Sequence, residues 1–522
     1  MTTQNQNVAD FLLEGKPDGR EALLTLQGSH TYGEVRSASA AVAAYLARAG
    51  GVKGDRALLA SENEFFWVTA YLGILRAGLV CVPLPPTVSI AELSHILQTT
   101  EAHFAFVQGG FAVKHAGLLR KVSLVAEKES RDHNGMQATA DLPGIRTAFA
   151  SAEATSIPVN GTDLAALMFT SGSTGQPRGV MVSHGNIRAN TCSIIQSLGL
   201  NQSDRIMTVL PFHYCFGTSL LHTHLRVGGS LVLDPRFMYP EKILQRMQET
   251  QCTGFAGVPS HYQILLRRTS LRTKSFPHLR YVQQAGGSLA PVFLHELREA
   301  LPTTQIFVMY GQTEATARLS CLPSELLDER FGSIGKGIPG VRLRVENEAG
   351  KPVQPGETGE IVAEGENIAQ GYWRSPDETA ACFRDGRLYT GDHATVDEEG
   401  FIFVIGRAKD FLKCGGKRIS CKQLEQQLLE CEDLLDAAVV GVPDEVLGEA
   451  VQAFVVPRTG LAAPAERVRN FCKERWAFQL MPREIVVMGS LPKNSSGKVL
   501  KEQLKSRIAG IGAVTADPLR AG

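Results

Sequence analysis

The sequence has no excess of charge of either sign. Its 522 residues carry 53 basic and 53 acidic side chains, and no long run of one sign occurs. Proteins that bind nucleic acid or an anionic membrane mainly through charge need a positive excess. We therefore expect no nucleic acid and no membrane surface as the principal partner.

Paired cysteines and long apolar spans are missing as well. The 10 cysteines are scattered without a Cys-x-x-Cys pair, so neither a disulfide framework nor a zinc site is expected. Residues 1–10 are polar and lack the basic start and apolar core of a signal peptide. The most apolar window, 65–84, contains Arg76, which predicts a buried helix and strand and no membrane span. Together these absences favour a cytoplasmic protein with reduced thiols.

A Walker A loop, Gly-x-x-x-x-Gly-Lys-Ser/Thr, is also absent. Residues 170–179 instead read Thr-Ser-Gly-Ser-Thr-Gly-Gln-Pro-Arg-Gly, between an apolar run at 164–169 and a second short strand at 180–183. Glycines have no Cβ, so several backbone N–H groups can converge there on one anion. From its residues alone, the stretch is either a phosphate cradle or an ordinary turn between strands.

The length exceeds what one hydrophobic core usually serves, so more than one domain is expected. In the first part of the chain, strand-like and helix-like apolar patterns alternate, which is typical of helices laid on a mainly parallel sheet. The patterns predict helices at 32–49, 64–76 and 184–198 and strands at 56–61, 79–83, 164–169, 206–210, 281–284 and 306–309. Short strands and turns dominate 335–405, and a mixture of helices and strands follows.

We therefore predict an α/β fold in three parts. Residues 1–409 form a large N-terminal domain of parallel-rich sheets with helices, which includes a small β subdomain. Residues 410–507 form a smaller α+β C-terminal domain. Residues 508–522 are small and polar, and we expect them to form a disordered tail.

Five further motifs follow the glycine-rich loop in order. They are Tyr310-Gly311-Gln312-Thr313-Glu314, Gly359-Glu360 through Gly371-Tyr372-Trp373, Tyr389-Thr390-Gly391-Asp392, Gly406-Arg407-x-Lys409-Asp410 and Pro492-Lys493-x-x-Ser496-Gly497-Lys498. With the loop, they resemble the adenylate-forming superfamily of acyl-CoA synthetases, peptide-synthetase adenylation domains and luciferases. The resemblance extends over residues 10–505 and implies an enzyme that activates a carboxylic acid with ATP and Mg²⁺.

The resemblance assigns most of these residues to the nucleotide. It implies that ATP is bound by Thr170, Ser171, Gly172, Ser173, Thr174, Gly175, Arg178, Gly287, Tyr310, Gly311, Gln312, Thr313, Asp392 and Arg407. In these roles Tyr310 stacks on adenine, Asp392 accepts from the ribose hydroxyls, and Arg407 reaches ribose or α-phosphate. Glu314 and Thr170 are implied as Mg²⁺ ligands and, with Lys498, as catalytic residues. Without the resemblance, the charged residues among them would be interpreted as halves of surface ion pairs.

The resemblance also implies where the acid binds. His213 or Tyr214 and, across from them, Gly286 are implied to contact it. Between Asp204 and Asp234 the sequence has no acidic residue, where amino-acid-activating relatives place an Asp against the substrate ammonium. We therefore expect an acid without an α-amine. Apolar and aromatic residues in 212–223, 255–262 and 311–319 favour an apolar acid, a medium- or long-chain fatty acid first and an aromatic acid second.

The implied reaction has two halves. The acid and ATP give an acyl-AMP and pyrophosphate, after which the mobile C-terminal domain turns about a hinge at Asp410 and a thiol displaces AMP. Coenzyme A is the expected thiol, because Gly415, Gly416 and Lys417 resemble the loop that lines the pantetheine tunnel of CoA ligases. A carrier-protein phosphopantetheine is the alternative, and the sequence leaves a homodimer open.

Three positions depart from the family pattern. Arg178 stands where the family has Lys, and Cys421 and Gln423 stand where it has Pro and Glu. Arg178 keeps the charge, so ATP binding is expected to persist. The other two departures lie next to the expected pantetheine loop and bear on which thiol is used.

Overall fold

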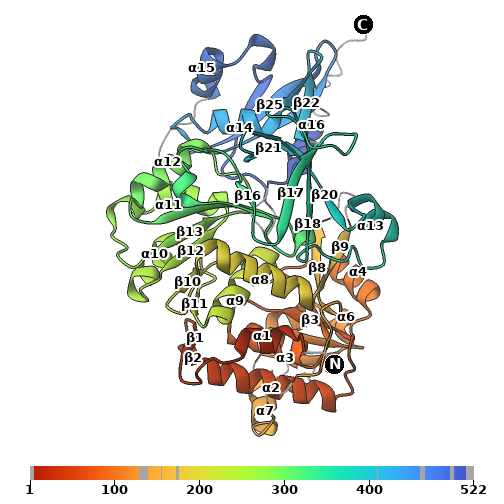
Figure 1. Cartoon of the computed structure of the whole chain (residues 1–522). Helices are drawn as coiled ribbons and strands as arrows, with labels where there is room; N and C mark the ends of the chain where they lie inside the picture. The colour runs from red at the N-terminus through yellow and green to blue at the C-terminus, as the bar shows by residue number, and fades with distance from the viewer. Residues whose placement is uncertain are drawn as a thin grey trace.

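The protein is described by a computed structural model, which covers residues 5–127, 139–153, 156–171, 176–407, 410–458, 465–493 and 499–512. Figure 1 shows the part of the chain up to residue 407 as a broad body and the C-terminal domain, in blue, above it. Among the described residues, no helix is both long and apolar enough to span a bilayer.

The first large sheet has seven strands within the described residues, in the order β7-β6-β5-β3-β4-β8-β9. Its strands pair in parallel except for β8 and β9, which form an antiparallel hairpin at one edge. The strands are β3 (Arg56–Ala60), β4 (Val80–Pro83), β5 (Phe104–Val107), β6 (Ser123–Ala126), β7 (Ala140–Asp141), β8 (Leu164–Ser171) and β9 (Pro177–Ser183).

The second large sheet has nine strands in the described part of the chain, in the order β16-β15-β14-β13-β12-β10-β11-β1-β2. Its central strands, from β1 to β14, are parallel, and the strands at both ends are antiparallel. The strands are β1 (Glu21–Leu24), β2 (Ser29–Thr31), β10 (Arg205–Thr208), β11 (Ser230–Leu233), β12 (Gly254–Gly257), β13 (Tyr281–Gln284), β14 (Gln305–Tyr310), β15 (Ser320–Leu322) and β16 (Lys336–Gly337).

Helices fill the space between the two sheets. They are α1 (Val8–Leu13), α2 (Tyr32–Arg48), α3 (Phe65–Arg76), α8 (His184–Leu198) and α9 (Cys215–Val227), and they share one hydrophobic core with both sheets. All 12 residues of α3 are buried, which its nearly continuous apolar sequence makes favourable. Helix α2 begins at a capping box formed by Thr31 and Glu34.

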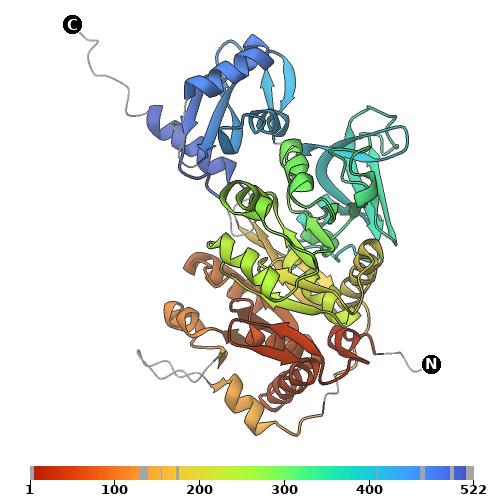
Figure 2. The same cartoon turned by 90° about the vertical axis from the view of Figure 1, so that its left-hand side faces the viewer.

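Further helices cover the outer faces of both sheets (Figure 2). Helices α4 (Ile90–Thr100), α5 (Gly109–Lys114) and α6 (Ala116–Leu119) pack on the seven-stranded sheet, and α7 (Leu142–Ala148) packs against α2. Helices α10 (Pro240–Glu249), α11 (Pro259–Arg268) and α12 (Pro291–Ala300) pack on the nine-stranded sheet. The predicted α/β fold with parallel-rich sheets is confirmed.

A small antiparallel sheet follows the second large sheet. It consists of β17 (Val341–Glu346), β18 (Gly359–Gly365), β19 (Phe383–Arg384), β20 (Arg387–Val396) and β21 (Ile402–Arg407), with α13 (Pro376–Cys382) beside it. It corresponds to the small β subdomain predicted at 335–405.

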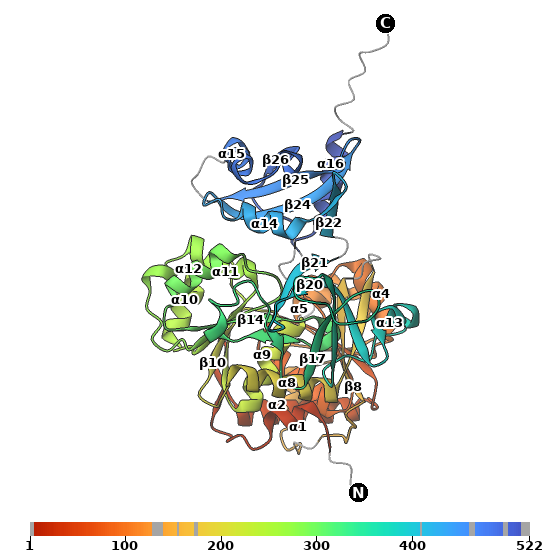
Figure 3. The same cartoon turned by 45° about the horizontal axis from the view of Figure 1, so that its top comes forward.

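The C-terminal domain is an antiparallel-rich sheet packed with helices, and Figure 3 shows it joined to the larger body beyond β21. It contains β22 (Phe411–Cys414), β23 (Lys417–Ser420), α14 (Cys421–Leu428), β24 (Leu434–Asp444), β25 (Gly448–Pro457), α15 (Ala465–Arg475), β26 (Glu484–Val487) and α16 (Lys501–Gly512).

Helix α16 continues to Gly512, past the predicted end of the C-terminal domain at residue 507. The predicted domain boundaries stay predictions. The helix is anchored by the fully buried Leu504, and each added residue extends it without a new nucleation cost. Residues 513–522 lie outside the described residues.

Candidate active site

The predicted nucleotide residues gather at the carboxyl edge of the nine-stranded sheet. The parallel strands β13 and β14 end there, and in open α/β sheets this edge is where ligands bind. The small sheet reaches the same place because its Asp392 accepts a hydrogen bond from Tyr310 at the end of β14. The β8–β9 hairpin reaches it through Tyr372, which pairs with Val180 of β9 in an isolated bridge and donates to Glu314.

Asp392 is held by two donors at the edge of the small sheet. Tyr310, the last residue of β14, donates its hydroxyl to Asp392 Oδ2 at 2.7 Å, and Arg407 Nε donates to Oδ1 at 3.0 Å. The neighbouring carboxylate raises the pKa of Arg407, and burial raises the pKa of Tyr310 well above its ordinary value. Asp392, the predicted ribose ligand, and Arg407, which is predicted to bind the ribose or the α-phosphate, therefore form an ion pair with each other.

Glu314 is tied to the β9 side of the site through Tyr372. The Tyr372 hydroxyl donates to Glu314 Oε1 at 2.8 Å, and burial together with this carboxylate raises the pKa of Tyr372. The Arg178 guanidinium lies 4.6 Å from the centre of the Tyr372 ring and forms an ion pair with Glu378 at 3.3 Å. The predicted metal ligand and the predicted phosphate-loop cation thus contact the same aromatic ring.

The β8–β9 hairpin holds the two ends of the predicted phosphate loop together. Thr170 pairs with Arg178, and Ser171 pairs with Pro177. The strand pairing therefore begins at Pro177, three residues before the strand that the apolar pattern predicts. The centre of the loop, Gly172, Ser173, Thr174 and Gly175, lies outside the described residues.

Three polar atoms around this loop are buried and have no hydrogen-bond partner among the described residues. They are Thr170 Oγ1, Arg178 Nε and Gln312 Nε2. Buried polar groups in folded proteins are almost always hydrogen-bonded, and among the described residues these atoms are free to pair with a polar ligand. A hydroxyl and a carboxylate are oxygen ligands of the kind that Mg²⁺ accepts, so Thr170 and Glu314 fit the predicted metal.

Three glycines keep the surface beside this site free of side chains. A Cβ on Gly311 would lie 1.9 Å from the carbonyl oxygen of Ala317, so no side chain fits there. Gly286 has φ +81°, in the region that favours glycine, and Gly287 lies close to Pro259. A flat ligand can therefore lie directly against the backbone that follows β13 and β14.

His213 and Tyr214 lie between β10 and α9. Their rings are in contact, with centroids 4.4 Å apart, so the structure does not separate the two predicted acid contacts. His213 is buried, and burial lowers its pKa to about 3, so the imidazole is neutral. Its Nε2 has no hydrogen-bond partner within the described ranges and is available to a polar substrate group.

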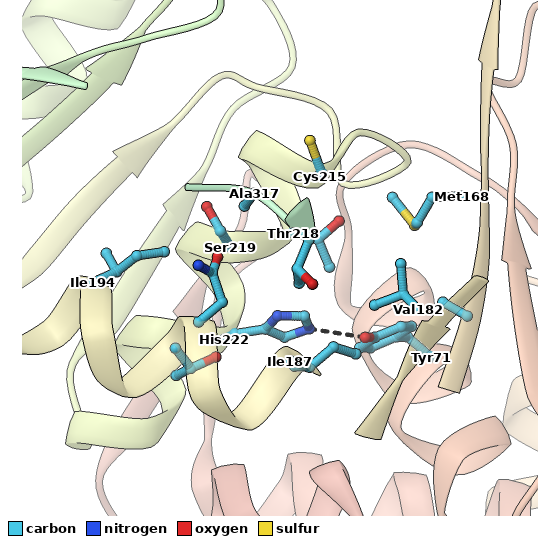
Figure 4. A pocket seen from close by; sticks show the side chains of 14 residues that line it. Tyr71, Met168, Val182, Ile187, Ile194, Cys215, Thr218, Ser219, His222 and Ala317 are labelled. Atoms are coloured by element: carbon cyan, nitrogen blue, oxygen red, sulfur yellow. Dashed lines mark hydrogen bonds between the residues drawn. The ribbon is translucent and has the colours of Figure 1, made fainter. Parts of the chain in front are cut away.

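A cavity of about 20 Å³ lies beside α9 (Figure 4). At its floor, His222 Nε2 and the Tyr71 hydroxyl form a hydrogen bond of 2.8 Å, and burial lowers the pKa of His222 to about 3. A volume of this size holds roughly one water molecule. The cavity is lined by Tyr71, Ala166, Met168, Val182, Ile187, Asn190, Thr191, Ile194, Cys215, Thr218, Ser219, His222, Thr316 and Ala317.

The lining differs in part from the segments that the sequence indicates. Segments 212–223 and 311–319 contribute, and Thr313 donates its hydroxyl to the cavity residue Cys215 at 3.4 Å. Segment 255–262 does not line this cavity. Helix α8 and the β8–β9 hairpin contribute instead, which the sequence pattern could not show because they are far away in the chain.

Comparison with known proteins identifies the family. Residues 12–373 match the model of AMP-binding enzymes, and residues 423–498 match that of the AMP-binding enzyme C-terminal domain. The chain belongs to the AMP-binding enzyme family.

Relatives of this AMP-binding enzyme match it along nearly their whole length. A feruloyl-CoA synthase of Amycolatopsis sp is 32% identical over 480 residues, which cover 91% of this chain and 94% of that one. The solved anthranilate CoA ligase AuaEII, in complex with anthranoyl-AMP, has a TM-score of 0.88 at 25% identity and covers 98% of each chain. The O-succinylbenzoate CoA synthetase MenE from Bacillus subtilis, in complex with ATP and a magnesium ion, has a TM-score of 0.81 at 27% identity and covers 96% of this chain and 99% of that one.

These matches confirm the predicted superfamily and enzyme class. The AMP-binding enzyme is an acid–CoA ligase whose small-molecule substrates are ATP, coenzyme A and a carboxylic acid. The roles of the individual residues stay predictions.

The C-terminal domain of the AMP-binding enzyme contacts the active-site edge of the large domain. Gln426 Nε2 donates to Ser288 Oγ at 3.1 Å, just beyond the glycines that follow β13. Asp410, the predicted hinge, directly precedes β22. Gly415 and Gly416, with φ of +57° and +75°, form the turn between β22 and β23, and the side chain of Lys417 lies outside the described residues.

Lys498 also lies outside the described residues, but both ends of its loop are placed. Lys493 and Val499, the described residues on either side of it, pair in an isolated bridge. Burial and, to a smaller extent, the Lys493 ammonium lower the pKa of His261 on α11 to about 4, so Lys493 lies near the large domain. Lys493 therefore lies near the first turn of α11, which follows β12.

Sequence reasoning missed two residues of this site. Tyr372 lies within a recognised motif, but nothing in the motif indicates that its hydroxyl binds Glu314. Lys422 is half-buried at the junction of the domains and donates to the carbonyl oxygen of Val404 at 3.2 Å. Burial lowers its pKa, and the Asp392 carboxylate offsets part of this shift. The available signal for Lys422 was its position directly after Cys421, which departs from the family pattern.

Proposed function

We propose that this AMP-binding enzyme activates a compact, mainly apolar carboxylic acid as its acyl adenylate and transfers the acyl group to coenzyme A. The observation that carries the proposal is the convergence of Glu314, Asp392 and Arg178 around buried polar atoms that have no partner among the described residues. These groups lie at the sheet edge that binds ligands in α/β proteins.

In the first half-reaction, a carboxylate oxygen of the acid attacks the α-phosphorus of ATP, and the bond to the pyrophosphate oxygen breaks. Both reactants are anionic, so catalysis requires positioning and electrostatic stabilisation. We assign Arg178 and Lys498 to the phosphate charge, Asp392 to the ribose and the Tyr310 ring to adenine. Magnesium, held by Thr170 and Glu314, would neutralise phosphate charge.

In the second half-reaction, the C-terminal domain turns about Asp410 and the thiol attacks the acyl carbon, so that AMP leaves. The glycines of the β22–β23 turn leave room for a pantetheine arm, because a Cβ on Gly416 would meet no atom within 4 Å. The domain boundaries at residues 409 and 410 follow from this proposal, since only the C-terminal part moves.

The cavity favours a compact acid over a long-chain fatty acid. Its floor is closed by the neutral pair His222 and Tyr71, and it holds roughly one water molecule in the structure, so an acyl chain would have to open it. Relatives of this enzyme are named for their action on ferulate, anthranilate and O-succinylbenzoate, and these names support an aromatic acid. All ten cysteines are free, which supports a cytoplasmic site of action.

The test identifies both the acid and the thiol acceptor. Purified protein is given a panel of fatty and aromatic acids, and AMP release is measured with coenzyme A and with a phosphopantetheine-bearing carrier protein. We expect release with an aromatic acid and coenzyme A. AMP release with the carrier protein but not with coenzyme A would support the carrier-loading alternative. If no acid in the panel gave pyrophosphate release, the proposal would be refuted.

A further inference from the structure

Two arginines are buried among the described residues, and they differ in their surroundings. Both are 2% exposed. Arg76 has its charge paired: Nη1 lies 3.2 Å from Asp10 Oδ1, and Nε donates to Ser39 Oγ at 3.1 Å. Arg318 forms no ion pair with any described residue, and its Nε and Nη2 have no hydrogen-bond partner there. An unpaired buried charge is costly, so Arg318 requires an explanation.

The backbone of Arg318 is fixed although its guanidinium is not paired. Its N–H donates to Asn190 Oδ1 at 3.1 Å, and its carbonyl oxygen accepts from Asn190 Nδ2 and Asn367 Nδ2. The guanidinium carbon lies 3.8 Å from the centre of the Phe216 ring. Burial lowers the pKa of Arg318 to about 10, so the side chain remains a cation at neutral pH. A cation–π contact of about 2 kcal/mol offsets only part of the cost of burying it.

Arg318 is not itself a lining residue of the cavity described above, but it adjoins residues that are. Thr316 and Ala317, which directly precede it, line the cavity, and so does Asn190, which holds its backbone. Cys215, another lining residue visible in Figure 4, is close enough to interact with its charge. The unpaired cation thus neighbours residues that line the cavity, whereas the floor of the cavity is formed by the neutral groups of His222 and Tyr71.

We propose that Arg318 is an anion-binding residue of the acid cavity, and that the preferred acid carries a second anionic group, such as a second carboxylate, besides the one that reacts with ATP. This inference rests on the proposed function. The second anion would supply the missing partners of Nε and Nη2, in the forked geometry that guanidinium groups offer to carboxylates.

The experiment uses pairs of acids that differ only in this group. Each aryl or short alkyl dicarboxylic acid is paired with its monoamide, which has the same shape and no second charge. Acid-dependent pyrophosphate release gives kcat/KM for both members, with wild type, with Arg318→Met and with Arg342→Met. Arg342 is a matched control, because its side chain is 63% exposed and lies on the small sheet.

We expect wild type and Arg342→Met to favour at least one diacid over its monoamide by about 100-fold, the value of one or two charged hydrogen bonds. In Arg318→Met this ratio should fall to about one, while kcat/KM for the monoamide changes by less than about threefold. An equal loss for both members would indicate a structural role only and would overturn the inference.

A binding measurement does not depend on a variant that folds. The diacid should raise the melting temperature of wild type, and its monoamide at the same concentration should not, because only the diacid pairs the buried charge. Equal shifts would overturn the inference. Pyrophosphate release with monocarboxylic acids alone would also overturn it and leave the proposed function standing, whereas no release with any acid would refute both.

Discussion

Asp392 offers a test of the nucleotide site whose magnitude can be worked out from its contacts. Its carboxylate accepts from Tyr310 at 2.7 Å and pairs with Arg407 at 3.0 Å. Replacing it with Asn keeps the shape, retains one acceptor and removes the charge. The side chain of Arg407 is 37% exposed, so the lost pairing with it is screened by solvent. We expect Asp392→Asn to destabilise the fold by only about 1–2 kcal/mol.

The substitution Asp392→Asn should weaken ATP binding more than it destabilises the fold. If the carboxylate accepts from both ribose hydroxyls, the variant loses charge-assisted hydrogen bonds worth about 3 kcal/mol together, so the KM for ATP should rise about 100-fold. The KM for the acid should change by less than about threefold, because Asp392 does not line the acid cavity. Acid-dependent exchange of labelled pyrophosphate into ATP measures both constants.

Deoxynucleotides supply the control. With wild type, 2′-deoxy-ATP and 3′-deoxy-ATP should be poorer substrates than ATP, because each lacks one hydroxyl. With Asp392→Asn, removing either ribose hydroxyl should lower kcat/KM for the nucleotide little further, because the carboxylate that would accept from it is already gone. The assignment of Asp392 to the ribose would be refuted if the losses from the substitution and from removing a hydroxyl simply added. It would also be refuted if the KM for the acid rose in place of that for ATP.

Three further predictions concern the catalytic lysine, a glycine and two histidines. Lys498→Ala should lower pyrophosphate exchange at least about 100-fold and spare thioester formation from a supplied acyl adenylate, and equal losses would contradict its role. Gly311→Ala should lower the melting temperature and abolish exchange, because its Cβ would clash with a carbonyl oxygen, whereas Gly109→Ala, which meets no atom within 4 Å, should do neither. His213 and His222 have folded pKa values of about 3, below the unfolded value, so their contribution is fully present above about pH 6.5 and is lost as the pH falls. Each histidine should lower the free energy of unfolding by about 2 kcal/mol between pH 7 and pH 5. Urea unfolding should therefore show that His222→Gln loses about 2 kcal/mol less than wild type over this range.

The sequence predicted the fold where periodicity is strong and local. The helix at 184–198 and the strand at 281–284 have the predicted bounds, because a capping box at Ser183 and a short apolar run define them locally. The start of β9 at Pro177 was not predictable, because it depends on antiparallel pairing with β8 across the glycine-rich loop.

For the site, the motifs predicted which residues meet but not how they interact. They placed Asp392 and Arg407 together at the nucleotide, yet they gave no sign that the two form an ion pair. Arg318 follows a recognised motif by four residues, and its isolation from acidic groups becomes apparent only when α8 and α9 pack around it. Long-range packing is the information that a single sequence lacks.

The central claim is that a carboxylate oxygen of the acid becomes bonded to the α-phosphorus of ATP. The most direct measurement uses an acid labelled with ¹⁸O in its carboxylate, with ATP, magnesium and coenzyme A, and analyses the products by mass spectrometry. The account predicts that the AMP released carries one labelled oxygen and that the pyrophosphate carries none. Unlabelled AMP, or label in the pyrophosphate, would contradict an acyl-adenylate intermediate.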